Sequence, residues 1–182
     1  MNETIIKIRQ KLFAFRNGVV AEQIRRTGDP HAIILGCLLP DIMQIAKQFT
    51  PSPDLANALW MDKKHRECRI IATMLYPAEN FDTDTATAWA HDVETTEIAD
   101  VLCFKLLRHA TCATSLWKSL LLSDSELVQY TGLRLLVNLM NSGKITPSIE
   151  LKSQLHEISA TGIMRPVMAQ ISEELASVKN MD

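Results

Sequence analysis

The sequence predicts an all-α protein of about ten to twelve helices. Apolar residues recur at intervals of three and four along nearly the whole chain, and the two-residue alternation typical of strands is hard to find. Prolines and glycine-containing turns divide this pattern into segments of helical length. From residue 53 onward, pairs of segments recur about every 30 to 45 residues, which is typical of stacked helical hairpins. We therefore expect one helical-repeat domain over residues 1–182.

Three short helices are expected before residue 40. The first is expected to begin after Asn2 as its cap and to end at Asn17, and the second covers residues 19–26. Asp29 and Pro30 are a cap and a first-turn residue, so a short apolar helix is expected over residues 31–37.

Caps and prolines mark the starts of the next four helices. Ser52 and Asp62 are expected to accept hydrogen bonds from the first turn of the helix that follows each of them. Proline is compatible with the first turn because it needs no backbone donor there. The predicted ranges are 39–47, 53–60, 64–76 and a helix that opens at Asp82 or Thr83 and holds Trp89.

The second half of the chain continues the pairing. Trp60, Trp89 and Trp117 each fall in the first helix of a successive pair, where large rings commonly pack between hairpins. The remaining predicted ranges are 95–108, 113–121, 125–140, 147–158 and 164–178.

Composition narrows the functional classes. The formal net charge is −2, from 19 basic and 21 acidic residues, which weighs against avid nucleic-acid binding but permits a local basic surface. The four cysteines have no paired spacing and no signal peptide precedes them, so we expect reduced thiols in a cytoplasmic protein. No segment has the length or apolarity of a membrane span. No motif of a nucleotide hydrolase, a dinucleotide enzyme or an α/β-hydrolase occurs, and neither a metal nor a cofactor is expected.

Basic residues fall on the second helix of each predicted pair. In a stack of hairpins, one helix of each pair lines the concave side. The second helices are expected to take this position, and a partner in the groove would meet their cationic side chains: Arg66, Arg69, Lys105, Arg108 and Arg134.

Asp100 is the most informative single residue. It lies in an otherwise apolar helical segment, where an acid needs either a partner or a function. The structural interpretation is a buried acid that is bonded to a helix N-terminus or paired with Arg69 or Lys105, and the functional interpretation turns it toward the groove.

Three parts of the chain together resemble the HEAT-like-repeat DNA alkylation repair glycosylases. The similarity covers roughly residues 18–140 and depends on the order and spacing of the motifs. The motifs are Gly36-x-x-x-Pro40-Asp41-Ile42-x-x-Ile45-Ala46-Lys47, Leu55-Ala56-x-x-Leu59-Trp60 followed by His65-Arg66-Glu67-x-Arg69-x-x-Ala72-x-x-Leu75, and Glu97-Ile98-Ala99-Asp100.

The resemblance implies a fold and an activity. It implies a right-handed HEAT-like α-α superhelix that binds duplex DNA in a cationic groove and excises positively charged alkylpurines. The catalytic carboxylate of the family matches Asp100. Aromatic side chains against the damaged nucleotide and an arginine on the DNA backbone complete the family's site.

The chain departs from the family at several of these positions. Thr96 stands where the family has tryptophan, Tyr130 where it has an arginine, and Gln170 near a later tryptophan. Arg134 lies one turn beyond Tyr130 and could reach a phosphate, while Trp89 and Tyr130 could supply ring faces.

Two functions therefore remain open. The first is binding and repair of duplex DNA, with Asp100 as the catalytic residue. The five basic residues above, together with Trp89 and Tyr130, would then contact the DNA. The alternative is a catalytically silent helical-repeat scaffold whose groove binds a protein partner. The lesion and the oligomeric state are not predicted.

Overall fold

The computed structural model describes residues 2–156, 158 and 160–176, and the regular elements of this part of the chain are helices, in agreement with the predicted class. It contains eleven α-helices and no strand, and one isolated bridge joins Ile33 to His65. The chain forms two compact units, Met1–Phe81 (unit 1) and Asp82–Asp182 (unit 2). The superhelix that the sequence suggests stays a prediction.

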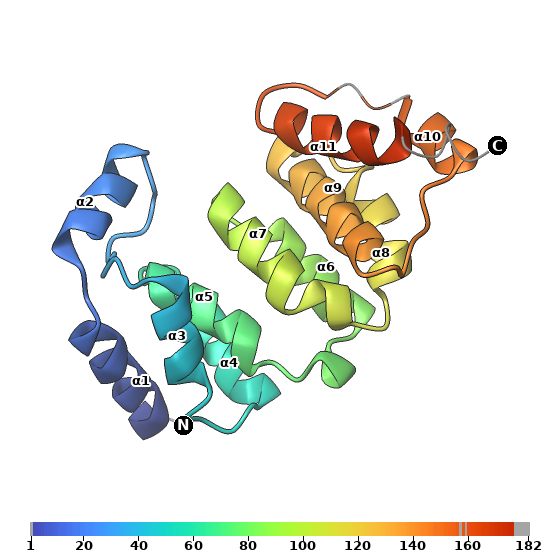
Figure 1. Cartoon of the computed structure of the whole chain (residues 1–182). Coiled ribbons are helices and arrows are strands. Elements are labelled where there is room, and N and C mark those ends of the chain that lie inside the picture. Colours follow the sequence, from blue (N-terminus) through green and yellow to red (C-terminus); the bar gives the residue numbers. More distant parts are fainter. Residues whose placement is uncertain (1, 157, 159, 177–182) are drawn as a thin grey trace. The chain divides into compact units, whose positions relative to one another are not determined.

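Unit 1 is built around α5, which is buried along nearly its whole length. Helices α3 and α4 pack against α5, and α1 contacts α3 (Figure 1). The Ser52 hydroxyl accepts a hydrogen bond from Leu55 N, which confirms the predicted cap of α4. The elements are α1 (Asn2–Ala14), α2 (Gly18–Arg26), α3 (Leu39–Ala46), α4 (Pro53–Trp60), α5 (Arg66–Leu75) and the 3-10 helix η1 (Ala78–Asn80).

The helix predicted over residues 31–37 was wrong, because distant groups bind the backbone of this segment. The buried Glu67 carboxylate accepts hydrogen bonds from Leu35 N and Gly36 N at 2.9–3.1 Å. Gly36 has φ +74°, and a Cβ there would lie 2.3 Å from Asn17 O. A helix would require the region of negative φ and partners within the segment.

Asp62 does not cap α5, contrary to the prediction. The helix begins at Arg66, with His65 as its N-cap residue and no side-chain hydrogen bond in that cap. The Asp62 carboxylate instead contacts Arg9 and His65.

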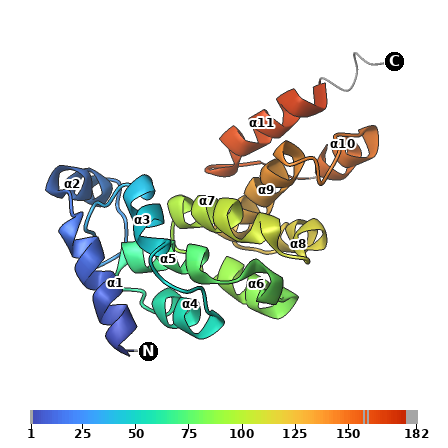
Figure 2. The same cartoon turned by 60° about the horizontal axis from the view of Figure 1, so that its bottom comes forward.

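The helices of unit 2 pack around α9, which contacts α7, α8 and α11, and the stacked hairpins that the sequence suggests stay a prediction. The first helices α6 and α8 contact each other, the second helices α7 and α9 contact each other, and α11 packs on α9 (Figures 1 and 2). Gly132 allows α8 and α9 to approach closely, since a Cβ there would lie 2.9 Å from Trp117 O. The elements are α6 (Thr83–His91), α7 (Thr96–Lys105), the 3-10 helix η2 (Leu107–His109), α8 (Ala113–Leu120), α9 (Glu126–Asn141), α10 (Ile149–His156) and α11 (Met164–Ala176). The predicted end at Val178 lies outside the described residues.

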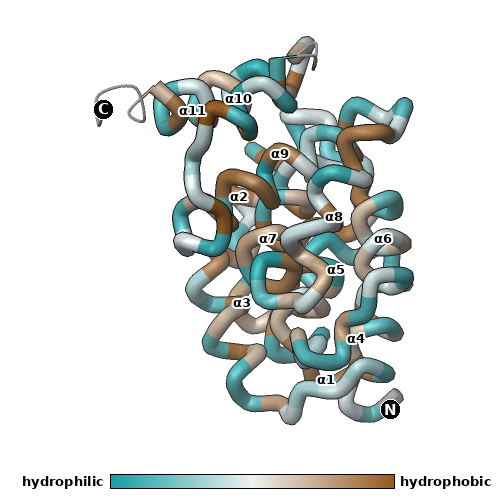
Figure 3. Tube along the Cα trace, turned by 90° about the vertical axis from the view of Figure 1, so that its right-hand side faces the viewer, coloured by the Kyte–Doolittle hydropathy of each residue, from teal (hydrophilic) through white to brown (hydrophobic). Residues whose placement is uncertain are grey.

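Apolar residues are distributed along the helices as the periodicity indicates. Figure 3 shows hydrophobic and hydrophilic residues interspersed along the trace. The four cysteines are buried and free, and Trp60 and Trp117 are 1% and 2% exposed. Among the described residues, the helices are too short or too polar to cross a bilayer.

Candidate functional site

The candidate site lies in unit 2, on the side of α7 that is not buried in the core. The Thr95 hydroxyl accepts a hydrogen bond from Ile98 N and fixes the start of this helix. Residues one turn apart share a helix side, so Asp100 and Phe104 lie one above the other. Both reach solvent, because the Asp100 side chain is 41% exposed and Phe104 is 42% exposed.

Asp100 is held by two side chains of α9. Arg134 Nε and the Tyr130 hydroxyl each donate a hydrogen bond to Asp100 Oδ1, both at 2.7 Å. The partners are therefore neither Arg69 nor Lys105, the two that the sequence suggested. Among the described residues, Asp100 Oδ2 accepts no hydrogen bond, so one carboxylate oxygen stays available to a ligand.

Arg134 connects this acid to α11. Its Nη2 donates to the Tyr130 hydroxyl at 3.3 Å, and its Nη1 donates to Gln170 Oε1 at 3.4 Å. A guanidinium has five N–H groups, so these three bonds leave two for a further acceptor. Asp100, Tyr130, Arg134 and Gln170 thus form one network.

The network keeps its donors in the protonated state. Burial and the hydrogen bond to Asp100 raise the pKa of Tyr130 to about 12. Burial opposes the charge of Arg134, but its hydrogen bond to Tyr130 and the charge of Asp100 outweigh burial and raise its pKa. Both side chains therefore donate toward Asp100 near neutral pH.

Basic side chains surround Phe104. Lys105 Nζ lies 4.6 Å and Arg108 Cζ 4.1 Å from the centre of its ring, which are cation-π distances. Lys144 Nζ donates to Arg108 O at 2.6 Å, and Arg108 Nε donates to His109 Nε2 at 3.0 Å. We call Phe104, Lys105, Arg108, His109 and Lys144 the basic patch.

The pKa of His109 reports the local potential. Burial lowers this pKa, and the charges of Arg108, Lys144 and Lys105 lower it further. A positive local potential of this kind attracts anions such as phosphate.

Several predicted site residues lie inside the protein. Arg66 is 4% exposed and pairs with Glu67 at 2.8 Å, while Arg69 is fully buried, with its guanidinium 3.9 Å from the centre of the Trp60 ring. Trp89 is 4% exposed and Tyr130 5%. A direct contact from any of these four to DNA would require repacking, whereas Lys105, Arg108 and Arg134 reach the surface.

The sequence analysis missed four members of the site. Phe104 could have been found because it follows Asp100 by one helical turn. Gln170 was noted only as a missing aromatic. Lys144 and His109 are distant in sequence from each other and come together only through the packing of η2 against α9.

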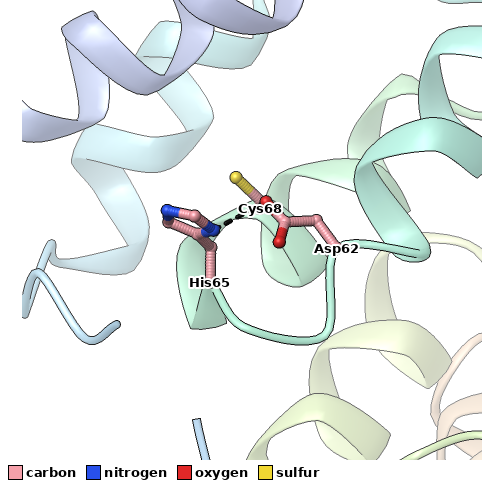
Figure 4. Close-up of side chains that lie close together, drawn as sticks. All are labelled: Asp62, His65 and Cys68. Carbon is pink, nitrogen blue, oxygen red and sulfur yellow. Dashed lines mark ion pairs between the residues drawn. The ribbon is translucent and has the colours of Figure 1, made fainter. Parts of the chain in front are cut away.

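Unit 1 holds a separate cluster that could bind a cation, where the sequence predicted no metal. One ligand atom each from Asp62, His65 and Cys68 lies within 4.8 Å of the others (Figure 4). This cluster is the one group of three or more such residues in the described part of the chain.

Comparison with known proteins gives a family. A family model described as DNA alkylation repair enzyme matches residues 8–159. No curated protein and no solved structure matches the chain. The match includes Asp100 and Arg134 and ends before Gln170.

Proposed function

Because the chain belongs to the DNA alkylation repair enzyme family, we propose that unit 2 binds alkylated duplex DNA and hydrolyses the N-glycosidic bond of a cationic alkylpurine. Asp100 is the proposed catalytic residue. The observation that carries the proposal is the state of its carboxylate. Arg134 and Tyr130 fix Oδ1, Oδ2 is not hydrogen-bonded among the described residues, and an exposed ring lies one turn away.

The chemistry suits a single carboxylate. A purine alkylated at N3 or N7 already carries positive charge and leaves as a neutral base when the C1′–N bond breaks. The positive charge passes to the sugar as an oxocarbenium ion, and a fixed negative group beside it lowers the barrier. Water then adds to C1′ and loses a proton, which completes hydrolysis.

Tyr130 and Arg134 act as positioning residues in this proposal. Two hydrogen bonds to Oδ1 restrict the rotation of the carboxylate, so Oδ2 can be held toward the sugar before the reaction begins. Arg134 also keeps two N–H groups for a phosphate oxygen of the DNA backbone.

The basic patch supplies the proposed contacts to the DNA backbone. Lys105 and Arg108 carry the charges that neutralise phosphates, and Lys144 adds to the positive potential. Phe104 is 42% exposed, so the part of its ring that Lys105 and Arg108 leave uncovered can contact a base or sugar. These contacts are independent of sequence, as repair of scattered lesions requires.

The test is the release of methylated bases from methylated duplex DNA, measured by chromatography of the freed bases. We expect release by the wild-type chain and its loss in Asp100→Asn, which keeps the shape of the side chain and removes its charge. Asp124→Asn is the control, since Asp124 is an exposed acid of the same unit. Its release should match the wild type.

A second function has one observation in its favour. The ion pair with Arg134 cancels much of the charge of Asp100, which would suit a structural acid in a catalytically silent scaffold that binds a protein partner. DNA binding without release by the wild type would refute the catalytic step. Neither DNA binding nor release would favour the scaffold.

A further inference from the structure

Asp62, His65 and Cys68 turn their polar atoms toward one another in unit 1. Asp62 and His65 come from the connection after α4, and Cys68 from the first turn of α5 (Figure 4). The spacing of three residues places them on one side of the chain at the start of a helix. A carboxylate oxygen, an imidazole nitrogen and a thiol sulfur are the three ligand types that zinc accepts in proteins.

The closest contact in this cluster joins the His65 imidazole to the Asp62 carboxylate. His65 Nδ1 and Asp62 Oδ2 lie 2.7 Å apart, yet Nδ1 is buried without a hydrogen-bond partner in the described part of the chain. The two atoms already face each other, and one ion bound by both would require them to separate by roughly 0.6 to 1 Å. In a tetrahedral zinc site, ligand atoms lie roughly 3.3 to 3.7 Å apart.

A positive charge already occupies the edge of the cluster. Arg9 Nη2 on α1 lies 2.6 Å from Asp62 Oδ2. The Arg9 side chain is 43% exposed, so it can withdraw into solvent when another cation takes its place.

An access route reaches the cluster. A pocket of about 490 Å³ is lined by Arg9, His65 and Cys68 and by apolar side chains that include Phe13 and Ile33. A fourth ligand, water or an added molecule, could occupy the side that faces this pocket.

We propose that Asp62, His65 and Cys68 bind one zinc ion, with a fourth position open to the pocket of unit 1. On binding, the Cys68 thiol loses its proton to water, its sulfur binds the metal, and the Arg9 guanidinium leaves Asp62. The site lies in unit 1, so the proposal does not depend on the DNA function of unit 2.

The experiment uses the full chain, freed of metal with a chelator and dialysed. Zinc is added in competition with a metallochromic chelator, and metal per chain is measured by mass spectrometry. We expect one zinc per chain. Cobalt in place of zinc should give the charge-transfer absorption of a thiolate ligand.

Variants separate this site from incidental binding. Loss of a residue that only hydrogen-bonds to a metal ligand weakens metal binding roughly 10- to 100-fold. Cys68→Ala removes a ligand itself, so it should weaken zinc binding by more than this. Cys37→Ala is the matched control, because Cys37 is a buried thiol of the same unit that donates to Leu12 O. Its affinity should equal that of the wild type.

Arg9→Gln is expected to bind zinc more tightly than the wild type, a result that a misfolded variant would not give. Removal of the competing cation should raise zinc affinity several-fold. Absence of stoichiometric zinc binding by the wild type, or equal affinity in Cys68→Ala, would overturn the proposal and leave the cluster as an ion-pair network. A lower affinity in Arg9→Gln would also contradict it.

Discussion

Replacing both Lys105 and Arg108 by alanine tests whether the basic patch is the DNA-binding surface. Lys105 and Arg108 hold their charged groups beside the exposed Phe104 ring, Lys144 donates to Arg108 O, and the lowered pKa of His109 favours its neutral form. We therefore count two phosphate contacts for this pair.

The count gives a magnitude. Each phosphate contact contributes about 0.9 to the slope of log affinity against log salt, so the double variant should lose about 1.8 from that slope. Between about 50 and 200 mM salt, the wild type should then lose roughly twelvefold more affinity than the variant. The assay is fluorescence anisotropy with a labelled duplex at several salt concentrations.

Lys118→Ala is the control for net charge. Lys118 is on α8 of the same unit and lies 5.4 Å from the centre of the Trp117 ring, so it also combines a cation with a ring. Its slope should change little. Equal slopes in the wild type and the double variant would refute the assignment of the surface, and an equal drop in Lys118→Ala would attribute the effect to total charge.

Three further predictions concern stability. Tyr130→Phe keeps the ring and removes the hydroxyl that donates to Asp100, so urea unfolding should show a loss of about 1–2 kcal/mol; an unchanged value would mean that this bond contributes nothing. The pKa of His109 is lower in the folded state, so the free energy of unfolding should fall as the pH drops below about 6.5. Urea unfolding at several pH values should show a smaller fall for His109→Gln than for the wild type. Equal pH profiles for the two proteins would contradict this prediction. Gly36→Ala places a Cβ 2.3 Å from Asn17 O at a positive φ, so the free energy of unfolding should decrease by at least about 2 kcal/mol. An unaltered Tm would count against the turn described above.

Local signals in the sequence were enough to place most helices. Ser52, Asp82 and Thr95 each accept a hydrogen bond from the first turn of the helix that follows, as their residue types and positions indicate. The segment over residues 31–37 failed because its apolar pattern resembles that of a helix while its hydrogen-bond partner, Glu67, lies more than thirty residues away.

The candidate site was predictable in part for the same reason. Asp100 and Arg134 were both chosen from the sequence, since an acid within an apolar helix and a basic residue on a helix side are local features. Their mutual contact spans 34 residues and depends on how α7 packs against α9. The burial of Arg66 and Arg69 could not be read from sequence, because positive residues on a helix are more often solvated.

The bonds of Glu67 have a consequence for the order in which a growing chain can fold on the ribosome. Until residue 67 has been synthesised, the amides of Leu35 and Gly36 lack their acceptor, and the connection between α2 and α3 has only its bonds to earlier residues, such as Asn17 N to Leu35 O. Contacts between residues that are far apart in the sequence form slowly, and the earlier segments stay exposed to solvent until they form. The connection between α2 and α3 can therefore complete its hydrogen bonds only after the start of α5 has been synthesised.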